Sequence, residues 1–471
     1  MEKLTKKYGL FTAICMVVGI VIGSGIFFKA PSVLAKAGNA LYSTLAWVIA
    51  GLIMVVIATT FGVMATKYEK VNGVVDYAEV TCGKTYAYYV GWFMSMIYYP
   101  AMTSVLAWVS ARYTLVAAIG NDSKIFSGEC IALALFYLIL AYFINTIAPK
   151  IAGKFQVSST IVKLIPILFV AIVGTVVGLF NGTLDANFAA TYEASAENPG
   201  LFPAICATIF AYEGWIVATA INSEIKDSKK NLPIALCLGT LIIVAAYAFY
   251  NIGVLGLADI NTLGDGTFVA IKAAGTLHPV ILAVINILVV VSCLGTLNGL
   301  MVGCTRGIYS LSARNEGISP DTFKQIDKKT NMPHNSAAFA LLTCAFWFVY
   351  FIFSMLEIFV FDSAVAGEPV NYGFDSSELP IITIYPLYVP ILIIMMIKEK
   401  DLHPVKRFVL PAISIVGVGV IVAASILSHK MANVWYLIVF AVIMGIGALV
   451  KYFTDKKQHT LLAASEDVAE E

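Results

Sequence analysis

The sequence is built of apolar stretches, each of about 20 residues or more, and a stretch of that length crosses the hydrocarbon core of a bilayer as a helix. The first stretch extends from Leu10 to Phe28, and others follow along almost the whole chain. A backbone in lipid must satisfy its own hydrogen bonds, so these stretches predict an all-α membrane protein.

The scarcity of charge supports this fold class. Only 13% of the 471 residues are charged, 59% are hydrophobic and the mean hydropathy is +0.86. A soluble protein averages about 25% charged residues. Disorder is excluded by the same composition. The net charge of +1 gives no basis for nucleic-acid binding. The apolar composition makes the lipid bilayer the expected surroundings of the chain.

We predict twelve transmembrane helices in a single domain, residues 9–452, between a short N-terminal segment, 1–8, and a tail, 453–471. The predicted bounds are 9–29, 42–66, 86–117, 129–148, 156–181, 201–222, 233–257, 277–311, 336–354, 379–397, 406–427 and 432–452. The first is expected to stay uncleaved, because it is long for a signal peptide and many spans follow. The 355–378 segment either ends the ninth helix or forms an outer lid.

The basic residues predict the orientation. If the N-terminus is cytoplasmic, most of the 30 lysines and arginines fall in cytoplasmic loops, as the positive-inside rule requires. Lys29 and Lys36 are among the few assigned outside. The end of the 355–378 segment carries Asp362, Glu368, Asp375 and Glu378 and no basic residue, which fits an external loop. Both termini are therefore expected in the cytoplasm, and the protein in the plasma membrane.

Two predicted helices are interrupted in the middle, by Gly23-Ser24-Gly25 and by Glu213-Gly214. They lie five spans apart, as two inverted repeats of five helices require, about 9–181 and 201–397, with extra helices at 406–452. Paired interrupted helices are the best sequence indication of a transporter's binding site.

The Gly23–Ile26 interruption can bind an anion, because unwinding frees backbone N–H groups where the helix dipole favours negative charge. The alternative is close helix packing, since Gly19 and Gly23 form a small-xxx-small pair.

Two charged residues lie within predicted spans. Glu213 is either a proton acceptor or substrate contact, or a protonated cap of the broken helix. Lys163 either binds carbonyl groups of the broken first helix or extends to the inner surface. In the eighth span, Thr296 and Asn298 either face the same cavity or bond their own helix.

No other chemistry is indicated. The eight cysteines form no C-x-x-C pair, and no histidine has metal-ligand spacing. The sequence has no P-loop and no G-x-S-x-G motif. We expect no enzyme activity, cofactor or metal.

In combination, GSGIF, FAYEGW, SCLGTLNG with a following Arg306, and the loop from Glu224 to Pro233 resemble the amino acid–polyamine–organocation superfamily. The similarity covers roughly residues 8–450 and is greatest to L-type amino acid transporters and bacterial serine/threonine and alanine/serine/cysteine exchangers. It implies a LeuT-like fold with two inverted five-helix repeats.

The resemblance also implies residue roles. Val21, Ser24 and Gly25 would hold the substrate carboxylate, and carbonyl groups near Phe210 and Ala211 its ammonium, with Phe210 as outer gate. Lys163 would replace a sodium ion, with Thr296 as its hydroxyl partner. The expected binding set is completed by Gly23, Ile26, Tyr212, Glu213 and Gly214.

The implied function is sodium-independent exchange of small neutral L-amino acids by alternating access. Glu213 departs from the family, where glycine or aspartate is common, and Ser228 replaces a usual proline. Proton-coupled import and antiport of cationic amino acids or polyamines through Glu213 therefore stay open. A channel and a membrane enzyme are the alternatives from other classes.

No cysteine lies between helices 3 and 4 except Cys130 at the edge, so no obligate ancillary subunit is expected.

Overall fold

The structure is a computed structural model that describes residues 9–68, 73–119, 127–193, 199–218, 225–263, 271–272, 274–355, 360–361, 370–371, 378–429 and 431–470. Most of the 355–378 segment and the N-terminal segment 1–8 lie outside the described residues. In the described chain the only strands are β1 (Val360–Phe361) and β2 (Val370–Asn371). They pair antiparallel, with Val360 opposite Asn371.

Ten helices of the described chain are long and apolar enough to cross a membrane. They are α3 (Ala40–Lys67), the continuous run α5 (Lys84–Phe93), η1 (Met94–Tyr98) and α6 (Tyr99–Ile119), α7 (Gly128–Ile147), the run α8 (Pro149–Phe169), η2 (Val170–Gly174) and α9 (Thr175–Phe180), α13 (Ser228–Leu257), α16 (Pro279–Ala313), α18 (His334–Met355), α19 (Leu379–Lys398), the run η4 (Val405–Val409) and α20 (Leu410–His429), and α21 (Met431–Glu470).

The two remaining predicted spans are each divided in the structure. The first consists of α1 (Leu10–Val21) and α2 (Gly25–Ala37), and the sixth of α11 (Leu201–Tyr212) and α12 (Trp215–Ala218). The interruptions lie where the sequence predicts them. Each half alone is too short to cross a bilayer, which needs about 20 residues.

The predicted end of the first span at residue 29 is wrong, because α2 continues to Ala37. Lys29 and Lys36, which we assigned to an outer loop, therefore lie within a helix. Lys29 is only 1% exposed, and an ammonium can be buried there because it meets the carboxylate of Glu378. The predicted end of the sixth span at 222 lies outside the described residues.

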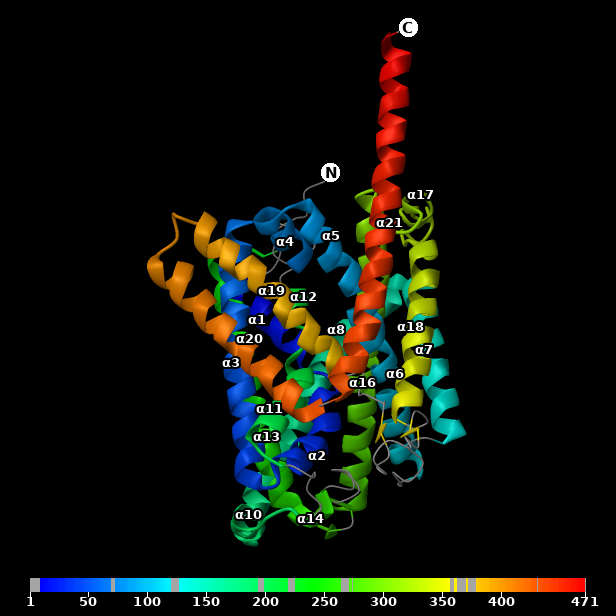
Figure 1. Ribbon diagram of the computed structural model, residues 1–471. Helices are drawn as coiled ribbons and strands as arrows, with labels where there is room; N and C mark the ends of the chain where they lie inside the picture. The colour runs from blue at the N-terminus through cyan, green and yellow to red at the C-terminus, as the bar shows by residue number, and fades with distance from the viewer. Residues whose placement is uncertain are drawn as a thin grey trace.

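Five further elements are short: α4 (Val74–Cys82), α10 (Thr183–Ala189), α12, α14 (Ile260–Leu263) and α17 (Pro320–Phe323). Helices α4 and α17 lie at one end of the bundle, and α10 and α14 at the other (Figure 1). The bundle therefore has two ends, which we name by these helices: the α4 end and the α10 end.

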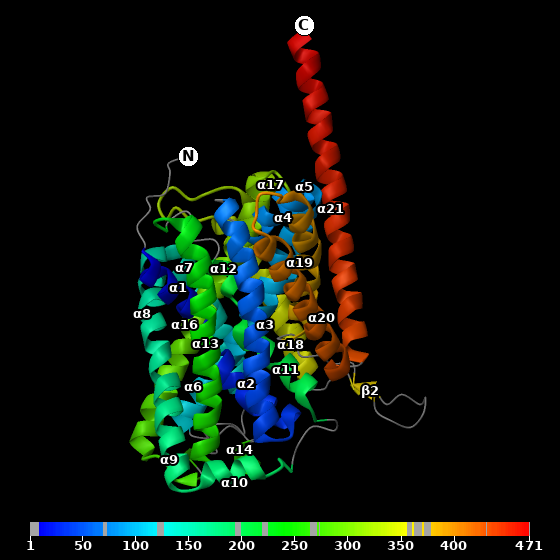
Figure 2. The same cartoon turned by 90° about the vertical axis from the view of Figure 1, so that its left-hand side faces the viewer.

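Two groups of helices enclose the centre of the molecule (Figures 1 and 2). In one group α3 packs along α13, and α2 packs against α11. In the other, α16 packs along α6, and α18 contacts both. Large apolar side chains are exposed on the outside, among them Phe180 (89%) and Ile161 (69%), as expected for a surface that faces lipid rather than water.

Helix α21 lies at the edge of the bundle and contacts α5, η1 and α20. It extends to Glu470, so the helix includes most of the predicted tail 453–471 and projects beyond the α4 end (Figure 1). Only 17% of its most apolar window is buried, which leaves most of this face for lipid.

Candidate functional site

The first helix is broken between Val21 and Gly25, where Ile22 has an extended conformation with ψ of 113°. Glycine is required at positions 23 and 25 because other helices of the same chain approach the backbone closely there. A Cβ on Gly25 would lie 2.6 Å from the Cα of Ala211, and one on Gly23 would lie 2.6 Å from Oγ1 of Thr296. The break in α1–α2 is therefore held directly against α11 and α16.

The second break follows Tyr212, the last residue of α11. Glu213 is extended, with φ −67° and ψ 157°, and Gly214 has φ of 107°, which side chains rarely tolerate. Glycine at position 214 thus allows the chain to turn sharply before α12 begins. The two breaks lie next to each other because α2 packs against α11.

A cavity of about 480 Å³ begins at the two breaks. It extends toward the α4 end, where Val74, Val75, Ser310 and Leu311 line it. The cavity brings together most of the predicted site residues, namely Val21, Gly23, Ser24, Gly25, Lys163, Phe210, Ala211, Glu213, Gly214 and Thr296.

Two predicted site residues do not line this cavity. Ile26 is fully buried in the apolar core. Tyr212 is turned toward α3, where its hydroxyl donates a hydrogen bond of 2.6 Å to the carbonyl of Trp47. Tyr212 therefore joins α11 to α3.

The break in the first helix has the properties of an anion site. Ser24 precedes α2, is 1% exposed, and its hydroxyl has no oxygen or nitrogen partner among the described residues. The first N–H groups of α2 have no acceptor in a preceding turn of that helix. Together these donors can bind a carboxylate at the positive end of the helix dipole.

Carbonyl groups at the second break can accept an ammonium. The Phe210 carbonyl accepts the Glu213 N–H at 3.3 Å, and the Ala211 carbonyl accepts the Tyr247 hydroxyl at 3.0 Å. A carbonyl oxygen has two lone pairs, so each can accept one more donor. An α-amino acid matches this pairing of donors and acceptors.

Lys163, on α8, contacts the broken first helix. Its side chain is 1% exposed, and Nζ donates to the carbonyl of Gly19 at 3.4 Å. Extension to the membrane surface is thus wrong for this conformation. Thr296 Oγ1 donates to the Ser292 carbonyl at 3.0 Å, within its own helix, and has no hydrogen bond to Lys163.

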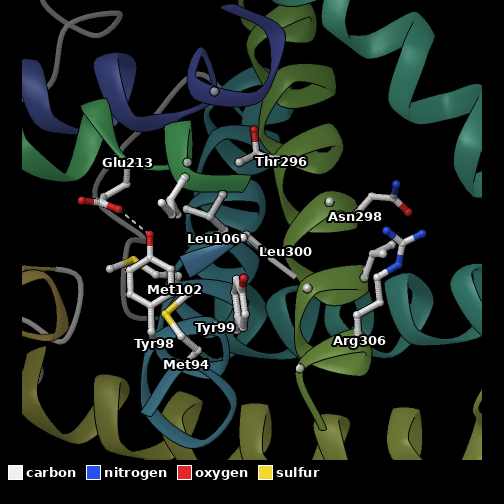
Figure 3. Close-up of a pocket in the computed structure, with 18 of the residues that line it drawn as sticks. Met94, Tyr98, Tyr99, Met102, Leu106, Glu213, Thr296, Asn298, Leu300 and Arg306 are labelled. Atoms are coloured by element: carbon white, nitrogen blue, oxygen red, sulfur yellow. Dashed lines mark hydrogen bonds between the residues drawn. The ribbon is translucent and has the colours of Figure 1, made fainter. Parts of the chain in front are cut away.

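Glu213 is held by two tyrosines that sequence reasoning missed. Tyr98 of η1 donates to Oε2 at 2.5 Å (Figure 3). Tyr385 of α19 donates to Oε1. No lysine or arginine pairs with this carboxylate in the described chain. Tyrosines are common in the sequence and carry no spacing signal, so only the fold identifies these two.

Three amides from different helices join in the wall of the cavity. Asn145 of α7 donates to Asn298 of α16 at 2.9 Å, and Asn298 donates to Gln156 of α8 at 3.1 Å. Arg306 lies farther along α16 and also lines the cavity (Figure 3). Of these four, sequence reasoning considered only Asn298 and Arg306.

The cavity is closed toward the α10 end by aromatic rings and an ion-pair cluster. Phe210 packs edge-on against Phe28, with ring centroids 6.0 Å apart, and Phe28 packs against Trp108 at 5.8 Å. The Lys29 ammonium lies 5.3 Å from the Phe210 ring. It also pairs with Glu378, the residue that precedes α19.

Cys206, Glu378 and His429 lie close enough to share a metal ion, and they are the one such group in the described residues. The carboxylate is already occupied, because it binds Lys29 at 2.6 Å and Lys36 at 3.0 Å. His429 Nε2 is 2.8 Å from the same carboxylate. Two adjacent ammonium groups oppose a cation, so this group fits an ion-pair cluster better than a metal centre.

Comparison with known proteins places this geometry in a family. The family model described as amino acid permease matches residues 8–449. The serine/threonine exchanger SteT of Bacillus subtilis (strain 168) is 27% identical over 413 residues, which cover 83% of this chain and 89% of the exchanger. The b(0,+)-type amino acid transporter 1 of Mus musculus is 24% identical over 453 residues, 96% of this chain and 88% of that transporter.

The large neutral amino acids transporter small subunit 2 of Oryctolagus cuniculus is 26% identical over 343 residues, which cover 72% of this chain and 63% of that protein. These relatives are transporters or exchangers of amino acids and not enzymes. The family match covers nearly the whole chain, including both breaks and the cavity between them. The chain therefore belongs to the amino acid permease family of multi-pass membrane transporters.

Proposed function

We propose that this permease is a sodium-independent exchanger of small neutral L-amino acids in the plasma membrane. The observation that carries the proposal is the broken first helix, where Ser24 and Gly25 line the same cavity as Phe210 and Ala211 of the second break. The Ser24 hydroxyl has no oxygen or nitrogen partner among the described residues, and the Phe210 and Ala211 carbonyl groups can each accept a further donor. These groups complement both charges of an α-amino acid. The similarity to a serine/threonine exchanger favours small neutral side chains.

Sodium independence is supported by Lys163. Its ammonium lies against the Gly19 carbonyl of the broken helix and supplies a positive charge at that position. A sodium ion would compete with this charge for the same carbonyl oxygens.

Alternating access is supported by the shape of the site. The cavity extends to the α4 end and is closed toward the α10 end. With both termini in the cytoplasm, as the basic residues predict, this is an inward-facing conformation. We further propose twelve spans, with inverted repeats over about 9–181 and 201–397, which would rearrange around the two breaks.

Radiolabelled uptake into proteoliposomes tests the proposal, with the purified chain alone as transporter. Serine, threonine and alanine inside the vesicles should accelerate uptake of the same amino acids, and replacement of sodium by choline should change nothing. Absence of uptake for every amino acid of a broad panel, with or without internal substrate, contradicts the proposal. Uptake that depends on a second polypeptide contradicts our expectation that no ancillary subunit is needed.

Glu213 favours a second candidate function. This carboxylate lines the cavity and is bonded by two hydroxyl groups rather than by a cation. It can exchange a proton or pair with the amine of a cationic substrate. Proton-coupled import predicts uptake driven by a pH gradient in vesicles without internal amino acid. Cationic antiport predicts that lysine, arginine or a polyamine competes with serine.

A further inference from the structure

Arg306 is the arginine that lines the cavity, and it lies well away from the two breaks. It is ten residues beyond Thr296 on α16, so the two differ by about 15 Å along the helix axis at 1.5 Å per residue. Thr296 contacts the break at Gly23. Arg306 therefore lies in the part of the cavity that leads toward the α4 end.

The charge of Arg306 is not neutralised by a neighbour. Its side chain is exposed, and it forms no hydrogen bond or ion pair within the described chain. Two basic residues near this end are paired: Arg314 with Asp76 and Glu79, and Lys451 with Asp455. Arg306 thus differs from Arg314 in having its guanidinium available.

The cavity lining places no carboxylate near the Arg306 guanidinium among the described residues. Among the described residues, its acidic member is Glu213, which lies at the breaks and is bonded by Tyr98 and Tyr385. A single sign of charge in a cleft with low-dielectric walls attracts the opposite ion along the cleft. The part of the cavity toward the α4 end therefore attracts anionic groups.

Small residues hold the remaining wall of α16 against α6 and η1. Gly299 and Gly303 lie two turns and one turn, respectively, before Arg306 on the same helix face, with spacings of four and then three residues. A Cβ on Gly303 would lie 3.1 Å from the Tyr99 ring, so the gap between α16 and α6 has little space for a side chain at this position. The long side chain that this part of the face presents to the cavity is Arg306.

A neutral donor lies on α8, which packs against α16. Gln156 lines the cavity, and its Oε1 accepts a hydrogen bond from Asn298. This bond leaves Nε2 of Gln156 as a donor with no partner among the described residues. Nε2 would lie 3.4 Å from a Cβ on Gly299, so the amide faces the same stretch of α16 as Arg306.

We propose that Arg306 forms a second, transient site that receives the α-carboxylate of an amino acid arriving from the cytoplasmic side. The guanidinium fork matches the two oxygens of a carboxylate, which Lys163 at the breaks does not. The bound amino acid then moves along α16 to the donors at Ser24. This inference rests on the proposed function, and it adds a determinant of affinity that acts on one face only.

Kinetics from each face test the proposal, with right-side-out and inside-out membrane vesicles and radiolabelled serine. Arg306→Gln should raise KM about tenfold for serine offered at the cytoplasmic face, as expected for loss of a charge-assisted bond, and leave KM at the outer face unchanged. Arg306→Lys should give an intermediate value. Lys154→Gln is the matched control, because Lys154 is exposed near the same end but does not line the cavity.

Ionic strength gives a readout that a structural role would not change. Wild-type KM at the cytoplasmic face should rise with salt, because salt screens attraction of the carboxylate, and Arg306→Gln should lose this dependence. An unchanged cytoplasmic KM in Arg306→Gln overturns the inference. So does an equal loss at both faces in Arg306→Gln and Arg306→Lys. If the wild-type protein exchanges no amino acid, the proposed function itself fails, which is a different outcome.

Discussion

Lys29 and Glu378 form a buried ion pair between helices that are far apart in the chain. Nζ of Lys29 lies 2.6 Å from Oε1 of Glu378, and their side chains are 1% and 2% exposed. Glu378 also binds Lys36 at 3.0 Å and lies 2.8 Å from His429. The pair joins α2 to the start of α19 just beyond Phe210, on the side of the cavity toward the α10 end.

Neutralising Glu378 is expected to destabilise the protein more than neutralising Lys29. Glu378→Gln removes the carboxylate from two ammonium groups, whereas Lys29→Gln leaves Glu378 with Lys36 and His429. Breaking a buried pair costs about 3–5 kcal/mol, and Lys29→Gln should cost less because its partner keeps other contacts. Thermal unfolding in detergent measures the order. The exposed pair Lys324–Asp321 is the control, and Lys324→Gln should change little.

The same variants should expose Cys206, a natural reporter of the closed face. Its Sγ lies 3.9 Å from Glu378, and the residue is 3% exposed. If the ion-pair cluster holds this face closed, Lys29→Gln should increase labelling of Cys206 by a membrane-impermeant maleimide added outside. Peptide mass spectrometry separates Cys206 from the other seven cysteines. Equal labelling of wild type and variant would contradict a gating role for the pair.

Sequence reasoning located the breaks but not the ion-pair cluster. Apolar length and glycine spacing are local properties, so the interruptions at Gly23–Gly25 and Glu213–Gly214 could be predicted. The pairing of Lys29 with Glu378 depends on contact between segments 349 residues apart, and no local pattern contains it. Sequence reasoning assigned Lys29 to a loop because an isolated charge is costly in a membrane helix. The local sequence does not indicate that Glu378 is its partner.

The same limit applies within the candidate site. Glu213 and Lys163 were recognisable because charge is rare within apolar spans. Tyr98, Tyr385 and Gln156 were not, because their residue types occur throughout membrane helices. Sequence reasoning included Tyr212 and Ile26 in the predicted binding set because their neighbours belong to it. Adjacent helical residues, however, point about 100° apart. In the structure neither residue lines the cavity.

Lys163→Ala is expected to impair exchange and leave substrate binding largely intact. The ammonium contacts the Gly19 carbonyl, which lies before the break and not among the Ser24 donors. Its loss should alter movement of α1 more than capture of the carboxylate. Scintillation-proximity binding and vesicle exchange, measured on the same preparation, separate the two effects. Lys154→Ala serves as the control, and wild-type exchange in Lys163→Ala would remove any coupling role for this lysine.

Glu213→Gln should discriminate between the candidate transport modes. A glutamine still accepts the hydroxyl groups of Tyr98 and Tyr385 but binds no proton and carries no negative charge. For proton-coupled import, uptake driven by a pH gradient should be lost. For cationic antiport, selectivity should shift away from lysine and arginine. Tyr98→Phe is the companion variant, since it removes one hydroxyl and keeps the carboxylate. For neutral exchange alone, both variants should keep the substrate profile of the wild type.

Gly25→Ala is expected to abolish exchange by separating the two broken helices. The added Cβ would lie 2.6 Å from the Cα of Ala211, and a backbone atom of a packed helix cannot move aside as a flexible side chain can. Overpacking of this kind costs about 1–3 kcal/mol, and displacement of α2 from α11 would also misplace the Ser24 donors relative to the Ala211 carbonyl. Gly419→Ala is the matched control, because nothing lies within 4 Å of its added Cβ and alanine favours a helix. Exchange and thermal stability are measured on both variants. A Gly25→Ala protein with wild-type exchange would show that contact between the two breaks is not needed for transport.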